Sequence, residues 1–185
     1  MAGRAKPLAI GPQVTNPLAP KPVRGGHIPS PYGPMTALVD DQGRLTRLAF
    51  PGEVSSFRWR IDSQAITWDD KAVTHVADQV AAYFAGKRRD FDLPLAPAGT
   101  AFQQRMWAAL RRIPFGAHFT YGAFAAQLGL AKGARAIGAA NGANPISLII
   151  PCHRLIATSG HLTDYAGGLA VKRGLLEFEG VLPAS

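Results

Sequence analysis

Three reactive side chains stand together near the C-terminal end of the chain. Cys152 is the only cysteine among 185 residues, and His153 and Arg154 follow it directly. The thiolate is the nucleophilic form of cysteine, and imidazole or cationic neighbours lower a thiol pKa from its free value of about 8.5. The arrangement predicts an activated nucleophile, although a lone cysteine can also be a small buried hydrophobe.

A histidine that works as a base is usually held by a carboxylate. The segment GGLAVKRGLLEFEG offers Glu177 and Glu179, and the residues alone favour neither. Residues 146–150 read as a buried strand that Pro151 interrupts, which places Cys152 where that strand breaks open. Since neighbours on an extended chain point to opposite sides, His153 is expected to reach the sulfur through a water molecule.

The elements that must position these side chains form a C-terminal unit of helices. Thr100 and Gln103 predict a capping box at the start of a helix over 100–113. Thr120 caps a second helix that Gly129 ends, and after a short turn the segment ARAIGAANGA has helical spacing. The pattern predicts a helix-turn-helix of the kind that reads DNA, with Arg135 on a thin face of small residues.

The preceding residues predict a smaller α/β unit. Two β-favouring runs, 35–39 and 45–50, are separated by a turn segment and predict a hairpin. Apolar spacing predicts a helix over 73–84, capped by Asp69 or Asp70 and ended by Gly86. Residues 1–28 are proline-rich and basic and are expected to form a flexible arm. The expected domains are therefore 29–95 and 96–185, joined by a proline-punctuated connector.

Composition narrows the class of partner. The formal net charge of +8 favours a polyanion, with nucleic acid the leading candidate. One cysteine rules out an internal disulfide and fits a reducing compartment, so we expect a cytoplasmic protein, or a nuclear one in a eukaryote. No apolar stretch approaches a membrane span of roughly 20 residues. The five histidines lack metal-ligand spacing, so neither a metal nor another cofactor is expected.

Several blocks in a fixed order carry a family resemblance. They are PCHR at 151–154, NP at 144–145, ARAIG at 134–138, YAGGLAVKRGLLEFEG at 165–180, and residues 100–129. Together they resemble the O6-alkylguanine-DNA alkyltransferases. The resemblance implies an α/β protein: a small ribonuclease H-like N-terminal domain, then a mainly helical, winged-helix-like C-terminal domain that carries the helix-turn-helix.

The resemblance also implies an activity. Such a protein flips O6-alkylguanine, and often O4-alkylthymine, out of double-stranded DNA and transfers the alkyl group irreversibly to its own cysteine, here Cys152, in a single turnover. His153 would deprotonate the thiol through a water and be held by Glu179. Asn144 would be the hinge residue next to this catalytic set. The expected partner is double-stranded DNA containing alkylated bases. The protein is expected to act as a monomer and not to associate with a membrane.

Positions on the recognition element follow from the same resemblance. DNA contacts fall on Arg135, which would fill the vacated base stack, and on Tyr121, Ala134 and Asn141. The lesion pocket would include Tyr165 and Ser159. Asp164 departs from the family pattern and is expected to influence substrate preference. Arg154 is expected only to form an ion pair, with Glu177 or an aspartate.

Two other functions remain open at this point. Related alkyltransferase-like proteins bind the lesion without reacting, but they carry tryptophan where this chain has Cys152. A thiol hydrolase or peptidase could use Cys152 and His153, although such enzymes place these residues far apart in sequence. A cysteine phosphatase would need an arginine six residues after the cysteine, where Thr158 stands.

Overall fold

The structure is a computed structural model that describes residues 23–54, 66–130 and 132–184. Of the flexible arm expected over residues 1–28, residues 1–22 therefore lie outside the described residues. The remainder, Val23–Ile28, is not an arm but strand β1 of the sheet.

A four-stranded sheet forms the N-terminal unit, with strand order β3-β2-β1-β4. The expected hairpin is confirmed: β2 (Met35–Val39) pairs antiparallel with β3 (Leu45–Ala49). β1 pairs antiparallel with β2 and parallel with the short edge strand β4 (Ile66–Trp68). The hairpin turn is fixed by Asp40, whose Oδ1 accepts hydrogen bonds from the backbone N–H groups of Gln42 and Arg44.

Two glycines explain why β1 was missed in the sequence. Glycine disfavours strands, so VRGGHI does not read as one. A Cβ on Gly25 would lie 2.8 Å from the side chain of Leu38, and one on Gly26 would lie 2.5 Å from that of Val73. Glycine is thus required where β1 is covered on both faces, and packing outweighs the strand propensity.

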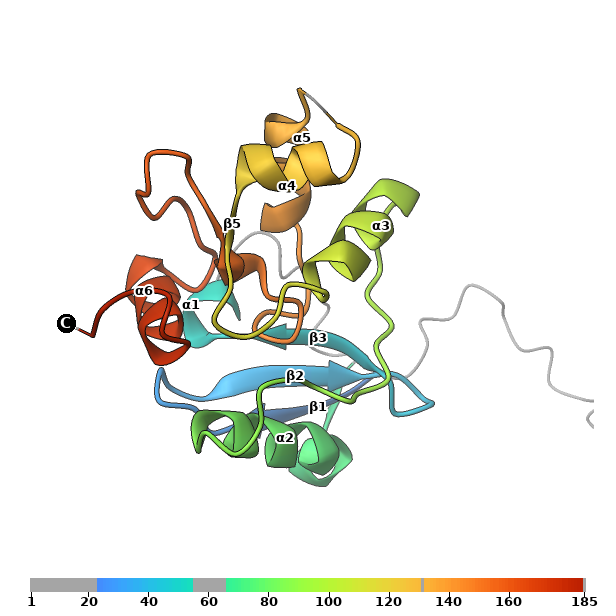
Figure 1. The fold of residues 1–185 in the computed structure, drawn as a ribbon. Coiled ribbons are helices and arrows are strands. Elements are labelled where there is room, and N and C mark those ends of the chain that lie inside the picture. The colour runs from blue at the N-terminus through green and yellow to red at the C-terminus, as the bar shows by residue number, and fades with distance from the viewer. Residues whose placement is uncertain (1–22, 55–65, 131, 185) are drawn as a thin grey trace, which may run out of the picture.

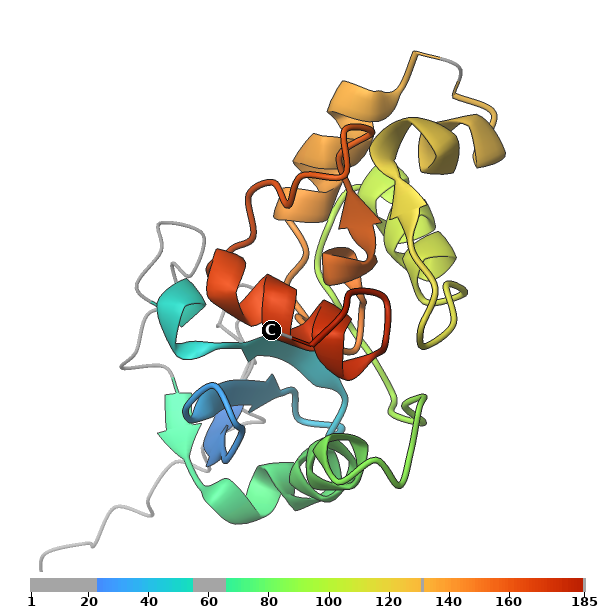
Figure 2. The ribbon, with the colours of Figure 1, turned by 60° about the vertical axis from the view of Figure 1, so that its left-hand side comes forward.

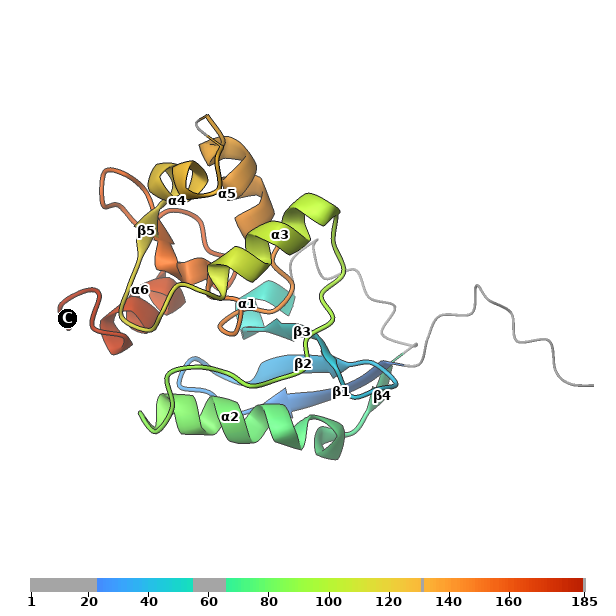
Figure 3. The same ribbon diagram turned by 45° about the vertical axis from the view of Figure 1, so that its right-hand side comes forward.

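Helix α2 (Thr74–Phe84) covers one side of the sheet, while the C-terminal helices lie on the other (Figures 1 and 3). It follows a short 3-10 helix, η3 (Asp70–Val73), which is capped by the side chain of Asp69. Gly86 has a φ of +71°, as a residue that ends a helix in the left-handed region does. A one-turn helix, α1 (Pro51–Val54), continues from β3 toward the C-terminal unit.

The C-terminal unit is mainly helical, as expected. Its first helix, α3 (Ala101–Leu110), has the predicted capping box of Thr100 and Gln103. The predicted helix-turn-helix consists of α4 (Tyr121–Gln127), capped by Thr120, and α5 (Ala134–Gly142). Figure 2 shows the last helix, α6 (Leu169–Phe178), beneath this pair and facing the sheet. The short parallel strands β5 (Phe119–Thr120) and β6 (Leu155–Ile156) join the entry to α4 with the segment after Cys152.

The apolar run before Cys152 is not the strand that the sequence predicted. Residues 146–150 form compact turns, in which the N–H of Ile150 bonds to the carbonyl of Ile146 and Leu148 takes a φ of +72°. The run is held against β3, because the N–H of Ser147 bonds to the carbonyl of Leu48. The strand-like composition instead reflects complete burial between the two units. In the described residues no helix is long and apolar enough to cross a membrane.

Candidate active site

The reactive segment is a 3-10 turn, η4 (Cys152–Arg154), not an extended chain. The backbone N–H of Cys152 donates to the carbonyl of Ile150, and Arg154 donates to Pro151. The argument that Cys152 and His153 point to opposite sides of an extended strand therefore fails. In a 3-10 turn consecutive side chains are about 120° apart around the axis.

Cys152 is buried, with 5% of its surface exposed. Burial raises the pKa of its thiol to about 11, although the Asn144 side chain and the positive charge of Lys172 act in the opposite direction. The sequence predicted a lowered pKa from the adjacent His153 and Arg154, and for this resting structure that prediction is wrong. The cause is that the thiol is buried while both neighbours direct their side chains to a carboxylate.

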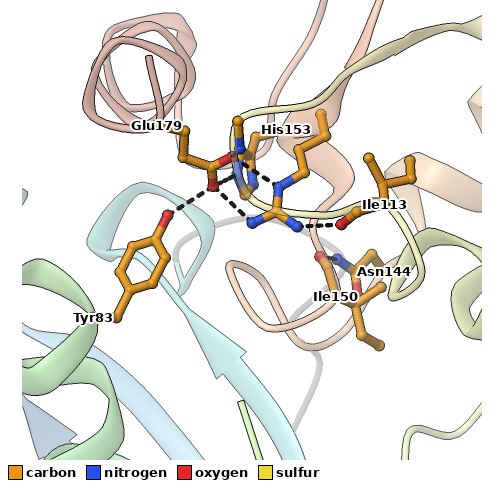
Figure 4. Close-up of polar contacts among 8 residues, drawn as sticks. Tyr83, Ile113, Asn144, Ile150, His153 and Glu179 are labelled. Carbon is orange, nitrogen blue, oxygen red and sulfur yellow. Dashed lines mark hydrogen bonds and ion pairs between the residues drawn. The ribbon is translucent and has the colours of Figure 1, made fainter. Parts of the chain in front are cut away.

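That carboxylate is Glu179, just past the last residue of α6 (Figure 4). Its Oε1 lies 2.8 Å from Nε2 of His153, and its Oε2 accepts a 2.8 Å hydrogen bond from Nε of Arg154. These contacts hold the pKa of Glu179 down at about 2 despite burial, so the group is ionised. Glu177, the other carboxylate left open by the sequence, instead lies 4.0 Å from Arg173. The ion-pair partner of Arg154 is thus Glu179, not Glu177 or an aspartate.

His153 is fully buried, and desolvation lowers its pKa, which favours the neutral ring. An ionised carboxylate can only accept hydrogen bonds. Nε2 of His153 therefore carries the ring proton and donates a hydrogen bond to Oε1 of Glu179. Nδ1 is then the basic nitrogen, and it is buried with no hydrogen-bond partner in the described part of the chain. A neutral histidine with a free ring nitrogen next to Cys152 is chemically able to take up the thiol proton.

Asn144 and Asn141 fix the backbone around the cysteine. Nδ2 of Asn144 donates to the carbonyl of Ile150 at 2.8 Å, and its Oδ1 accepts from the N–H of Ile146 at 3.0 Å. Nδ2 of Asn141, on α5, donates to the carbonyl of Cys152 at 3.2 Å. A direct hydrogen bond therefore links α5 to the reactive turn.

A cavity of about 820 Å³ opens between α5 and the segment that precedes α6. Four predicted site residues line it: Tyr121, Ala134, Asn141 and Tyr165. Asp164 also lines the cavity. Arg135 is exposed on α5 and is not part of the lining. Ser159 is not part of the lining either; it is exposed earlier in the same segment between β6 and α6, where its hydroxyl lies 3.1 Å from Nδ1 of His161.

Sequence reasoning missed two buried polar residues of this region. The hydroxyl of Tyr83, on α2, donates a 2.7 Å hydrogen bond to Oε1 of Glu179 across 96 residues of sequence. Nζ of Lys172 is fully buried and donates to the carbonyls of Leu155 and Thr163. Only Lys172 left a signal, because it shares the apolar face of α6 with Leu175 and Leu176 at helical spacing.

Nothing in the described residues resembles a metal centre: no three histidine, cysteine, aspartate or glutamate side chains gather there. The cluster around Glu179 instead joins an ionised carboxylate and a guanidinium to a neutral imidazole. Its arrangement suits proton uptake from a neighbouring thiol.

Comparison with known proteins assigns the chain to a family. A model described as "6-O-methylguanine DNA methyltransferase, ribonuclease-like domain" matches residues 23–97. The model for the DNA binding domain of the same methyltransferase matches residues 101–181. The chain belongs to this family.

Family members of high similarity carry the same enzymatic name. A methylated-DNA--protein-cysteine methyltransferase of Mycobacterium tuberculosis is 46% identical over 155 residues, which cover 82% of this chain and 89% of the relative. One of Salmonella typhimurium is 42% identical over 165 residues, covering 84% and 94%. The expected activity, that of a methylated-DNA--[protein]-cysteine S-methyltransferase, is confirmed.

A solved structure of the family supports the fold. The crystal structure of Mycobacterium tuberculosis OGT in complex with DNA matches with a TM-score of 0.75 and 45% sequence identity. The match covers 84% of this chain and 92% of that one. The predicted two-part architecture, a small α/β unit followed by a helical unit with a helix-turn-helix, is confirmed.

Proposed function

We propose that this protein repairs duplex DNA by flipping an O6-alkylguanine into the cavity beside α5 and transferring its alkyl group to Sγ of Cys152. The observation that carries the proposal is the link from cavity to thiol. Asn141 lines the cavity and also holds the carbonyl of Cys152. Cys152 itself is not part of the lining, so Asn141 is the residue that connects the cavity to a cysteine whose neighbour is a neutral histidine.

In the transfer step the thiol proton passes to Nδ1 of His153, directly or through water. Sγ then attacks the alkyl carbon, and a C–S bond forms as the C–O6 bond breaks. The guanine leaves as an anion and takes a proton from water, and the imidazolium later returns its proton to solvent. Ionised Glu179 stabilises the resulting imidazolium, as a carboxylate does in other nucleophile and histidine pairs. The thioether product is inert to water, so each molecule reacts once.

Duplex DNA is the proposed partner, met by α4 and α5. Arg135 stands exposed on α5 and is suited to occupy the gap that a flipped base leaves. Tyr121 and Ala134 line the cavity mouth, and the net charge of +8 favours phosphate contacts. We propose that the protein acts as a monomer in the compartment that holds the DNA, the cytoplasm of a bacterium or the nucleus of a eukaryote.

Within the pocket, Tyr165 is the proposed aromatic wall for the lesion. Its ring packs near Phe50 at a centroid distance of 6.4 Å. Asp164 lies beside it in the lining and is expected to influence the choice between guanine and O4-alkylthymine lesions. Ser159 lies outside the lining, with its hydroxyl against His161 of the same loop, so a pocket role for it requires this part of the loop to move.

The deciding experiment is mass spectrometry after one exposure to a duplex with a single O6-methylguanine. We expect the peptide containing Cys152 to gain about 14 Da, one methylene, with a yield capped at one equivalent per protein. Cys152→Ala should bind the lesion and give no adduct. Binding by the unaltered protein without an adduct would indicate a lesion-binding module, and continued turnover would indicate a hydrolase.

A further inference from the structure

A buried carboxyl group reaches the reactive turn from the N-terminal unit. Glu53 lies on α1 and is 4% exposed. Its Oε2 accepts a 2.8 Å hydrogen bond from the hydroxyl of Ser147, which belongs to the turns just before Cys152. The proposed transfer chemistry gives Glu53 no role, so its burial at this place needs another explanation.

The second oxygen of Glu53 faces the loop that lines the cavity. Oε1 is buried and has no hydrogen-bond partner within the described ranges. A Cβ on Gly167 would lie 3.2 Å from this oxygen and 3.0 Å from Cε1 of Tyr165. The same carboxyl group therefore bonds to Ser147, in the turns that lead into Cys152, and packs against the pocket loop at Gly167.

The charge state of Glu53 follows from these surroundings. Among the ion pairs of the described residues none includes Glu53. A buried carboxylate without a cation is costly, so the group holds its proton. Burial accordingly raises the pKa of Glu53 to about 7.

The titratable groups that face Glu53 are acids. The charge interaction of Glu53 with Cys152 raises the thiol pKa, and that with Tyr165 raises the phenol pKa. Lys172, on α6, is the cation that acts on Cys152 in the opposite sense. Because Glu53 and Cys152 both become anions on ionisation, each disfavours the ionisation of the other.

We propose that Glu53 is a positioning residue of this active site: as a neutral acid it ties the reactive turn and the pocket loop to the N-terminal unit, and its ionisation slows alkyl transfer. The inference rests on the proposed alkyl transfer and adds a pH-sensitive group to it. Below neutrality the acid is uncharged and thiolate formation at Cys152 meets no repulsion from it. Above neutrality its proton passes to solvent, and the carboxylate opposes the thiolate.

Glu53→Gln tests this directly, because the amide keeps an oxygen acceptor for Ser147 and cannot ionise. The measurement is the rate of methyl transfer to Cys152 from duplex O6-methylguanine, between about pH 6 and about pH 8.5. The rate of the variant divided by that of the unaltered protein should be near one at the lower pH and rise to about threefold or more at the higher. Asp78→Asn makes the same charge change on the exposed face of α2 and should give a constant ratio.

The outcomes separate the two proposals. A ratio for Glu53→Gln that stays constant with pH overturns the role of Glu53 while leaving alkyl transfer intact. Absence of any adduct with the unaltered protein refutes the proposed function instead.

A second measurement needs no Glu53 variant. The glutamates of the chain are Glu53, Glu177 and Glu179, so carbon-13 labelling of glutamate carboxyls gives few resonances. In the unaltered protein one carboxyl resonance should titrate near pH 7. The resonance of Glu177 is identified by its absence from the spectrum of Glu177→Gln. If no glutamate titrates above the usual range of about pH 4 to 5, the neutral-acid role is wrong.

Discussion

Burial holds both Cys152 and His153 in their neutral forms. The pKa of the thiol is raised to about 11 and that of the imidazole is lowered. A neutral pair cannot supply a standing thiolate, but it can exchange one proton and become an ion pair. Glu179, ionised and 2.8 Å from the imidazole, is placed to stabilise that pair. The network thus indicates activation during the reaction, when a lesion occupies the cavity, and not before it.

The Glu179 network also makes stability depend on pH. The pKa of Glu179 is lowered from 4.5 to about 2 in the folded protein, so its contribution is complete above the unfolded pKa and is lost as pH falls through the folded one. We expect the unfolding free energy to drop by about 3 kcal/mol between about pH 5 and pH 2 through this group alone. Chemical denaturation across that range measures it.

Glu179→Gln is the matching variant. It should lack most of this acid-dependent loss, and at neutral pH it should be less stable by about 3 to 5 kcal/mol because Arg154 keeps a buried charge without its carboxylate. Glu177→Gln, on the same helix, is the control and should retain the acid dependence. If the unfolding free energies of the unaltered protein and Glu179→Gln fall in parallel as the pH is lowered, folding does not lower the pKa of Glu179.

Residue identities near Cys152 could be predicted from sequence, but their long-range partners could not. Cys152 and His153 are neighbours in the chain, and the resemblance pointed to Glu179 ahead of Glu177. Tyr83 contacts Glu179 across 96 residues, and Glu53 contacts Ser147 across 94. No periodicity or spacing encodes such pairs, because they depend on how segments far apart in the sequence pack together.

At the level of elements, α4 and α5 connect the exposed surface that we propose faces DNA to the buried turn. Arg135 is exposed near the start of α5, while Asn141 near its end is buried and bonds to the carbonyl of Cys152. One helix therefore carries both the proposed wedge and a support of the nucleophile. If DNA displaces α5, the hydrogen bond from Asn141 would transmit the movement directly to the backbone of Cys152.

Arg135→Ala should separate base flipping from chemistry. Extrusion of a paired base costs a few kcal/mol, and the variant loses the side chain that offsets part of this cost. We expect methyl transfer from a duplex lesion to slow by about tenfold or more, and transfer from free O6-alkylguanine to change little. Single-turnover rates on the two substrates provide the comparison.

Lys71→Ala is the control for the loss of one positive charge, since Lys71 is exposed on η3 of the N-terminal unit, away from α5. It should affect both substrates alike. Equal slowing of both substrates by Arg135→Ala would remove Arg135 from the flipping role.

The starts of helices could be predicted from their caps, whereas the end of α3, at Leu110 and not at 113, and the segments around the site could not. The caps at Thr100 and Thr120 are local hydrogen bonds, so their residue types are visible in sequence. Strand β1 was hidden by glycines that packing demands. The run 146–150 has the composition of a strand but is bent by tertiary hydrogen bonds to β3 and by Asn144. In both places tertiary contacts override local preference.

In the whole molecule, the two units share one active site. The acid that orients His153 follows α6, and Tyr83 of α2 also donates a hydrogen bond to it. Glu53 of α1 accepts a hydrogen bond from Ser147, in the turns that lead into Cys152. The bridge between β3 and Ile146 makes the sheet itself part of the support for the turn. The N-terminal unit is therefore a structural component of the site, in keeping with a continuous core.

The charge of the whole chain gives the last prediction. With a formal net charge of +8, binding to undamaged duplex should depend on phosphate contacts and the release of counterions. For about four such contacts, raising salt from about 50 to about 200 mM should weaken binding about 100-fold. Transfer from free O6-alkylguanine involves no phosphate, so its rate should change little over the same range. Fluorescence anisotropy with Cys152→Ala measures the first quantity and the rate of adduct formation the second; a DNA affinity that ignores salt would mean that the excess charge serves another partner.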